Sequence, residues 1–315
     1  MHAVQVESWS EGPRYVTVED PPAPSDNQIQ LRVLATGLHQ VVRSRAAGTH
    51  YSTKELPHRP GIDCVGRDEA TGQLYYCLHI SPSFGTFAEY ITVDKSVVYP
   101  LPDGVDPAAF AASVNPAMSS WMAITQRTTG LPRGYTALIL GATSASGRLA
   151  AYAARTLGAG RVVGVARNAA ALAAVDGLDE RIVLRDPVGE TDYSCVVVGD
   201  DCDLVILDYI YGDATAHLLS SLGTRKKPVQ YVQIGAVAQP VAELPAALFR
   251  SYDLTVRGAG PGAWSFPALQ REMKVLVPKL AGWKLLETCS VPLKDVEAAW
   301  EDTSLQSKGR LVFIP

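Results

Sequence analysis

Apolar and polar residues alternate in short runs over the first third of the chain, a pattern typical of half-buried β-strands. The runs at residues 29–34, 87–93 and 96–99 show it most clearly. Clusters of proline and glycine, for example at residues 21–24 and 100–104, separate these runs. The spacing predicts a compact, barrel-like lobe composed of β-strands.

The pattern changes after about Asp106, where alanine-rich helical runs begin and apolar strands then alternate with helices. Residues 137–140 predict a strand, residues 148–157 a helix and residues 161–165 a second strand. Together they form one βαβ unit, which is the building block of parallel sheets.

Two later runs, at residues 203–207 and 229–234, are almost continuously apolar, as strands buried on both faces of a parallel sheet are. After about Thr255 the chain returns to segments interrupted by glycine and proline, and it ends in a strand-like run at 310–314. The predicted fold class is therefore α/β, with a doubly wound Rossmann sheet inserted between two parts of a β lobe.

Composition narrows the classes of partner. The chain is 47% hydrophobic and 19% charged with a net charge of −4, a composition typical of a folded globular protein. Its length of 315 residues predicts two lobes. Because there is no basic run beyond Arg225-Lys226-Lys227, we expect no nucleic-acid partner. No stretch approaches the ~18 apolar residues of a membrane span and no secretory signal opens the chain, so we expect a cytoplasmic protein that does not bind membranes. Five scattered cysteines predict free thiols.

The segment from Leu138 to Gly147 lies between a predicted strand and a predicted helix, where a dinucleotide-binding loop belongs. Against the pattern G-x-G-x-x-G, only Gly147 matches. Small residues let the backbone approach a diphosphate, and the N-terminus of the following helix attracts it. The alternative is a turn of small residues that only packs the helix onto the sheet. The residues predicted to bind the cofactor here are Gly141, Ala142, Thr143, Ser144, Ala145, Ser146 and Gly147.

About 20 residues past this loop, enzymes that use NAD carry an acidic residue for the ribose hydroxyls. This chain has Arg167 and Asn168 there, which suit a 2′-phosphate and predict NADPH as the cofactor. Alternatively, Arg167 is only a solvated charge at the end of a strand. Tyr209, Gly235 and Ala236 follow later strands at the same edge of the sheet, and we expect them to contact the cofactor as well.

Five stretches have the order and spacing of motifs from a known family. They are Pro60-Gly61-Ile62-Asp63-Cys64-Val65-Gly66, Gly85-Thr86-Phe87-Ala88-Glu89-Tyr90, Asn115-Pro116-Ala117-Met118, the loop from Gly141 to Gly147, and Ser307-Lys308-Gly309-Arg310-Leu311-Val312. With these, the chain resembles, nearly from end to end, a quinone-oxidoreductase-type member of the medium-chain dehydrogenase/reductase superfamily.

The resemblance implies a GroES-like substrate domain at residues 1–117 and 255–315 and a Rossmann NADPH-binding domain at residues 118–254. It also implies a homodimer formed through the edge strand of the cofactor domain. Arg310, in the C-terminal motif, is expected to contact the cofactor.

The resemblance further implies a reaction without metal. Zinc-dependent relatives carry a cysteine near Leu38 and a histidine near Ile62, and both positions are aliphatic here. Asp63 alone does not hold zinc. The family motif N-x-x-D would fall on His39 and Val42, so both of its polar residues are replaced in this chain.

Hydride transfer without a metal requires hydrogen-bond donors that polarise the substrate oxygen. The candidate catalytic residues are Tyr51, as a neutral donor, and His39, as a proton source, since histidine titrates near neutrality. Alternatively, Tyr51 is a barrel-edge aromatic residue and His39 a satisfied core histidine. Met118, Trp121 and Trp264 are candidates for an apolar substrate pocket, or are simply core residues.

The function predicted from these residues and the resemblance is an NADPH-dependent reductase of a small molecule, namely a quinone, an enone or another α,β-unsaturated carbonyl compound. Two alternatives stay open. One is a dedicated enoyl or carbonyl reductase of secondary metabolism, and the other is a non-catalytic NADPH-binding sensor or structural protein, which would bind NADPH without oxidising it.

Overall fold

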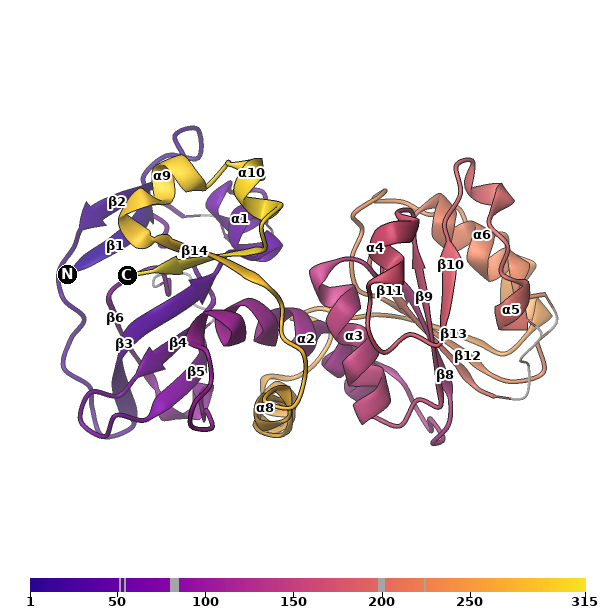
Figure 1. Cartoon of the computed structure of the whole chain (residues 1–315), viewed down its shortest axis with the longest axis horizontal. Helices are drawn as coiled ribbons and strands as arrows, with labels where there is room; N and C mark the ends of the chain where they lie inside the picture. The colour runs from indigo at the N-terminus through magenta and orange to yellow at the C-terminus, as the bar shows by residue number, and fades with distance from the viewer. Residues whose placement is uncertain (51, 54, 80–84, 198–201, 224) are drawn as a thin grey trace. The chain divides into compact units, whose positions relative to one another are not determined.

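The chain divides into two compact units, seen in the computed structural model in Figure 1. Unit 1 comprises Met1–Asn115 and Met273–Pro315, and unit 2 comprises Pro116–Glu272. Among the described residues, no helix combines the length and the apolar character needed to cross a membrane. The structure describes residues 1–50, 52–53, 55–79, 85–197, 202–223 and 225–315.

Unit 2 is built on a six-stranded sheet in the order β10-β9-β8-β11-β12-β13, in which every neighbouring pair is parallel. The strand order reverses beside β8, and doubly wound sheets bind ligands at such a switch point. The strands are β8 (Thr136–Leu140), β9 (Arg161–Ala166), β10 (Glu180–Val183), β11 (Leu204–Asp208), β12 (Val229–Gln233) and β13 (Leu254–Gly258).

Side chains of successive residues in a strand point to opposite faces, and β8 buries both of its faces for this reason. Ile139 packs into an alanine-rich cluster with Ala150 of α3. Leu138 packs into a second cluster with Leu218 of α6. Helices and turns along this part of the chain are α2 (Pro107–Arg127), α3 (Ala145–Thr156), α4 (Ala169–Ala173), η2 (Val188–Glu190), α5 (Ser194–Val197), α6 (Asp213–Ser221), α7 (Leu248–Ser251) and α8 (Phe266–Leu280).

The sheet extends beyond the boundary near Thr255 that the sequence predicts. β13 begins at Leu254 and pairs with β12 over its whole length, so unit 2 continues to Glu272. As an edge strand, β13 is only partly buried and contains Arg257. Its sequence therefore lacks the continuous apolar run that marks β8 and β11.

Unit 1 contains a two-stranded antiparallel sheet, β1-β2, and a sheet in the order β14-β15-β3-β4-β5-β7, in which β6 also pairs with β3. The strands are β1 (His2–Val6), β2 (Pro13–Thr17), β3 (Gln28–Gly37), β4 (Asp63–Arg67), β5 (Leu74–Leu78), β6 (Tyr90–Asp94), β7 (Val98–Pro100), β14 (Thr288–Pro292) and β15 (Arg310–Ile314). The helical segments are α1 (Gln40–Ala46), η1 (Lys95–Val97), η3 (Leu293–Asp295), α9 (Val296–Ala299) and α10 (Thr303–Gln306).

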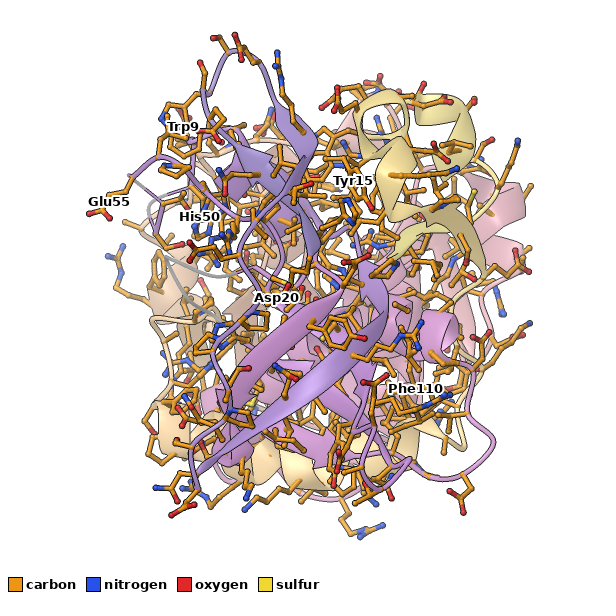
Figure 2. The ribbon with its side chains drawn as sticks, turned by 90° about the vertical axis from the view of Figure 1, so that its left-hand side faces the viewer. Trp9, Tyr15, Asp20, His50, Glu55 and Phe110 are labelled. Atoms are coloured by element: carbon orange, nitrogen blue, oxygen red, sulfur yellow. The ribbon has the colours of Figure 1, made fainter. Side chains whose placement is uncertain are left out.

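The predicted strands at 87–93 and 96–99 begin later in the structure, at Tyr90 and Val98. Phe87 lies outside β6 because its backbone N–H and carbonyl pair with Pro60 and Val4 instead of β3, and its ring lies 5.5 Å from the ring of Phe313. The segment before β7 forms η1 instead of a strand. Figure 2 shows the side chains of this unit, with Trp9 in the loop between β1 and β2 and Tyr15 on β2.

Candidate functional site

A cavity of about 580 Å³ lies at the carboxyl ends of the parallel strands of unit 2. The loops that follow β8, β9, β10, β11 and β12 all contribute to its walls. Five of the residues predicted from sequence line it, and they are Gly141, Thr143, Ser144, Arg167 and Tyr209. The structure therefore brings together residues that are up to 68 positions apart in the chain.

The loop after β8 needs glycine at both ends. Gly141 has a φ of +90°, a backbone conformation that glycine adopts without the steric cost of a Cβ. A Cβ on Gly147 would lie 2.2 Å from the carbonyl oxygen of Gly141, so only glycine lets α3 approach β8 this closely. The side chain of Ser144 caps α3 by accepting a hydrogen bond of 3.0 Å from the N–H of Gly147.

The remaining loop residues are placed behind or beside the cavity. Ala142 is fully buried, and Ala145 and Ser146 form the first turn of α3. This turn contains no acidic residue, so nothing within it offsets the partial positive charge of the helix N-terminus. The loop thus combines close backbone approach with a field that favours an anion.

Two guanidinium groups line the cavity, those of Arg167 and Arg185. Arg167 follows β9 and Arg185 follows β10, and both are exposed. Among the described residues, neither makes a side-chain hydrogen bond or an ion pair. Arg155 and Arg161 of the same unit are instead paired with Asp179 and Glu180. The two cavity guanidinium groups are therefore free to bind an anionic ligand.

Sequence reasoning missed Arg185, because the strand that it follows, β10, is a short edge strand with charged residues and gives no clear sequence signal. Asn168, also predicted to bind the cofactor, makes a local contact in the structure. Its side chain caps α4 by accepting a hydrogen bond of 3.0 Å from the N–H of Ala171. The amide oxygen of Asn168 is thus used within the protein.

Tyr209 is buried, with its hydroxyl 3.3 Å from Oγ of Ser119. Burial raises the pKa of Tyr209 to about 12, so the phenol stays neutral. The N–H of Gly235 donates to the carbonyl oxygen of Asp208. Ala236 lines a second, smaller cavity of about 330 Å³. From the loop after β12, it is Val237, Ala238 and Gln239 that line the larger cavity.

In unit 1, His39 lies between two charged groups and is 1% exposed. Its Nδ1 is 3.0 Å from Nη2 of Arg310, and its Nε2 is 3.1 Å from the carboxylate of Asp63. Because a guanidinium can only donate, Nδ1 must accept and the ring proton must lie on Nε2, which donates to Asp63. Both ring nitrogens of His39 are therefore engaged inside the protein.

The Asp63 carboxylate is fully buried and also accepts a hydrogen bond of 2.7 Å from the hydroxyl of Tyr76. Burial and the charge of Asp63 raise the pKa of Tyr76 well above its usual value, so it remains a donor. Burial lowers the pKa of Arg310, while the charge of Asp63 opposes this change. The four residues come from β3–α1, β4, β5 and β15, and neighbouring strands of one sheet thus hold a connected polar network.

The other residues predicted at a substrate site belong to different settings. Tyr51 lies outside the described residues. Trp121 of α2 is buried, and its Nε1 donates a 2.7 Å hydrogen bond to Glu272. Met118 and Trp264 are half-buried. The contacts of Trp121 are those of a core residue.

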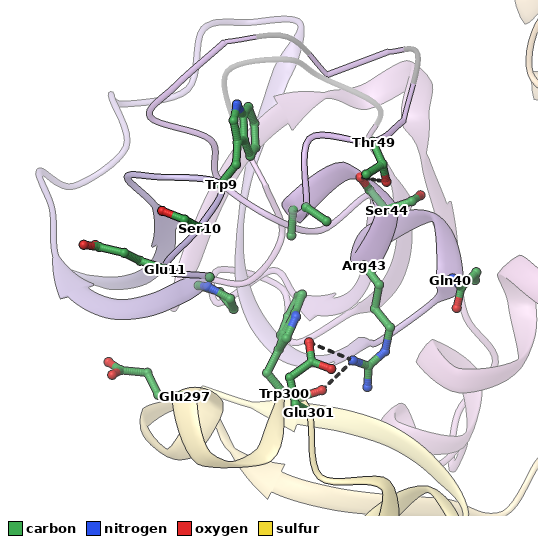
Figure 3. Close-up of a pocket in the computed structure, with 14 residues that line it drawn as sticks. Trp9, Ser10, Glu11, Gln40, Arg43, Ser44, Thr49, Glu297, Trp300 and Glu301 are labelled. Carbon is green, nitrogen blue, oxygen red and sulfur yellow. Dashed lines mark hydrogen bonds and ion pairs between the residues drawn. The ribbon is translucent and has the colours of Figure 1, made fainter.

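A further cavity of about 670 Å³ lies within unit 1, and Figure 3 shows its lining. Arg43 donates to the carbonyl oxygen of Trp300 and lies 3.7 Å from the carboxylate of Glu301. Its guanidinium carbon is 5.6 Å from the centre of the Trp300 ring. The cation in this cavity is therefore satisfied by its own walls. No group of three or more His, Cys, Asp or Glu side chains in the described part of the chain could hold a metal ion.

Comparison with known proteins places this geometry in context. No family model matches the chain. A protein of Emericella nidulans named as a probable NADPH-dependent quinone reductase is 37% identical over 360 residues, with 100% of both chains covered. The quinone oxidoreductase of Sus scrofa is 32% identical over 152 residues, which is 46% of this chain and 46% of its own length.

Solved structures share the fold. The quinone oxidoreductase of Thermus thermophilus, solved also as a complex with NADPH, superposes with a TM-score of 0.80 at 24% identity and covers 100% of both chains. The quinone oxidoreductase of Pseudomonas syringae pv. tomato superposes with a TM-score of 0.74 at 22% identity, covering 100% of this chain and 99% of its own.

Proposed function

This chain belongs to the quinone oxidoreductase group of the medium-chain dehydrogenase/reductase superfamily, and from that premise we propose that it is an NADPH-dependent reductase. Its substrates are quinones, enones or other α,β-unsaturated carbonyl compounds. The observation that carries the proposal is that Arg167 and Arg185, whose guanidinium groups have no partner among the described residues, line one cavity with the glycine loop of unit 2.

The residues of the cavity suit the parts of NADPH. The loop from Gly141 to Ser144 and the N-terminus of α3 offer backbone N–H groups to the diphosphate. Arg167 and Arg185 offer charge-assisted hydrogen bonds to the 2′-phosphate, which NADH lacks. The buried, neutral phenol of Tyr209 lines the wall beside them.

When bound, NADPH supplies a hydride to the conjugated carbonyl compound. The tasks of the chain are to orient the reactants and to provide the donor that stabilises the charge developing on the substrate oxygen. Tyr51 remains our candidate donor. For His39 we propose a positioning role, because both of its ring nitrogens are held by Arg310 and Asp63.

The test is to follow the absorbance of NADPH while quinones and enones are added one at a time. We expect oxidation of NADPH with at least one acceptor, and a strongly reduced kcat in Tyr51→Phe. Tight NADPH binding without oxidation by any acceptor would favour the non-catalytic sensor. Absence of NADPH binding would exclude both functions.

We also propose that two copies of the chain associate through β13. What supports this is the position of β13 at the edge of the sheet, where its backbone groups on one side have no strand partner among the described residues. Val256 on this strand is 43% exposed. We expect the native mass in solution to be that of a dimer. Val256→Lys should give a monomer, while Val275→Lys, at a 47% exposed position on α8, should not.

For the cell compartment we propose the cytoplasm. Cys64 and Cys77 face each other across β4 and β5, and both are free thiols, as is usual in a reducing compartment. We further propose that the reaction needs no zinc. A fluorescent fusion tests the location. Metal analysis of the active, purified protein tests the absence of zinc, and stoichiometric zinc would contradict it.

A further inference from the structure

Tyr211 of unit 2 has a left-handed backbone conformation. Its φ is +59°, and it is the only non-glycine residue with a positive φ in the described part of the chain. Left-handed backbone is costly for a residue with a Cβ, and such strain concentrates at functional sites. Gly212 follows it with a φ of +82° and adopts its conformation without that cost.

Asp208 holds the loop in this conformation. Its fully buried carboxylate accepts hydrogen bonds from the N–H groups of Ile210 (2.8 Å) and Tyr211 (2.9 Å). The other carboxylate oxygen accepts from the hydroxyls of Tyr231 and Thr215. Because Ile210 and Tyr211 begin the loop after β11, the Asp208 carboxylate at the end of that strand fixes the first half of the loop.

Gln239 fixes the second half of the loop. Its Oε1 accepts from the N–H of Asp213 at 2.7 Å, and its Nε2 donates to the Asp213 carboxylate at 2.9 Å. Both residues also line the larger cavity. Tyr211 therefore sits between two anchored points and cannot relax its backbone without breaking one of them.

Tyr211 lines two cavities of unit 2. Tyr211 lines the cavity of about 580 Å³ that contains Arg167 and Arg185, and also the cavity of about 330 Å³ that contains Arg257. No other described residue lines both. Shortening the side chain of Tyr211 is therefore expected to change the walls of both cavities.

We propose that Tyr211 contacts the bound dinucleotide, and that the protein keeps a strained tyrosine here because the ring closes the cavity against the cofactor. This rests on the proposed function, since it names one more residue of the same site. A flat aromatic side chain suits the role because it supplies a large contact area at a low cost in conformational entropy.

Three forms of the full-length protein test the proposal: wild type, Tyr211→Ala and Tyr211→Gly. The alanine variant loses the ring but keeps the strain, and the glycine variant loses both.

Calorimetric titration with NADPH should show an affinity about tenfold weaker in both variants, the equivalent of about 1.4 kcal/mol. Tyr211→Gly should melt about 2–4 °C above Tyr211→Ala, because glycine relieves the left-handed strain. Tyr75→Ala, at a half-buried tyrosine of unit 1, controls for loss of a ring elsewhere and should bind as wild type does.

The outcomes separate this inference from the proposed function. If wild type binds NADPH and Tyr211→Ala binds it within about twofold, the ring does not contact the cofactor and only this inference fails. If Tyr211→Gly is no more stable than Tyr211→Ala, the strain argument fails. If wild type itself does not bind NADPH, both proposals fail together.

Discussion

Arg167 and Arg310 lie at strand ends in different units, and the sequence predicts a cofactor contact for both. In the structure they have opposite surroundings. Arg167 is exposed and makes no side-chain hydrogen bond or ion pair with a described residue, whereas Arg310 is half-buried and donates to His39. An arginine at the end of a strand is therefore not by itself evidence of a ligand site. Whether its guanidinium group is available to a ligand depends on the partners that it already has in the protein.

The same contrast holds for the carboxylates near them. Asp63 takes part in the network of unit 1 and balances the charge of Arg310 through His39. Near Arg167 and Arg185 the cavity has two acidic residues, Asp186 and Asp213, and no ion pair joins either of them to these arginines among the described residues. The charges of this network in unit 1 thus offset each other, while the cavity of unit 2 leaves positive charge for a ligand.

The largest expected effect concerns His39. In His39→Leu, the fully buried carboxylate of Asp63 loses its contact with His39 and its link to Arg310, so the free energy of unfolding should fall by about 3–5 kcal/mol. Urea denaturation measures it. Tyr76→Phe removes one donor to the same carboxylate and should cost less, about 1–3 kcal/mol. A loss below about 1 kcal/mol in His39→Leu would mean that the network is not structural and would break the comparison.

The next effect concerns the cavity arginines. Arg167→Ala and Arg185→Ala should each weaken NADPH binding about tenfold and the double variant about a hundredfold, because each removes charge-assisted hydrogen bonds worth about 1.5–3 kcal/mol. The melting temperature should not change, since neither side chain stabilises the folded protein. Arg250→Ala, at an exposed position on α7, controls for the general loss of positive charge. Unchanged affinity in the double variant would show that these arginines do not contact the cofactor.

The smallest expected effect concerns His79, which differs from His39 of the same unit in the hydrogen bonds of its ring. Burial lowers the pKa of His79, and Nε2 of this side chain has no hydrogen-bond partner among the described residues. The folded state therefore binds the proton less readily than the unfolded chain. The stabilising contribution is complete above the ordinary pKa of about 6.5 and is lost as the pH falls through the lowered value.

Between about pH 7.5 and about pH 5, wild type should therefore lose more stability than His79→Asn, by less than about 1.4 kcal/mol, the equivalent of one pKa unit. Thermal denaturation at several pH values measures the difference. Parallel curves for the two proteins would contradict this assignment.

The central part of the parallel sheet could be predicted from sequence because its strands are buried on both faces. The runs that form β8 and β11 are wholly apolar apart from their ends, as is typical of strands buried on both faces. β10 and β13 lie at the two edges of the sheet and contain charged residues, so they gave no such signal. Because β10 was not predicted, Arg185, which follows this strand and lines the cavity, was not predicted either.

The role of His39 could not be decided from sequence because its partners are distant in the chain. Asp63 is 24 positions away and Arg310 is 271 positions away, and only the strand order of the folded sheet brings them together. The glycine loop was easier, since its signal is local. Even there, the sequence did not show that Gly147 serves the packing of α3 on β8 and that Gly141 lines the cavity.

The central claim is that Arg167 and Arg185, in the cavity of unit 2, bind the 2′-phosphate that NADPH has and NADH lacks. One measurement tests this claim most directly. Wild-type protein is titrated calorimetrically with NADPH and with NADH at the same ionic strength. We predict that NADPH binds at least about tenfold more tightly, as one charge-assisted hydrogen bond would provide. Equal affinity for the two nucleotides, or tighter binding of NADH, would contradict it.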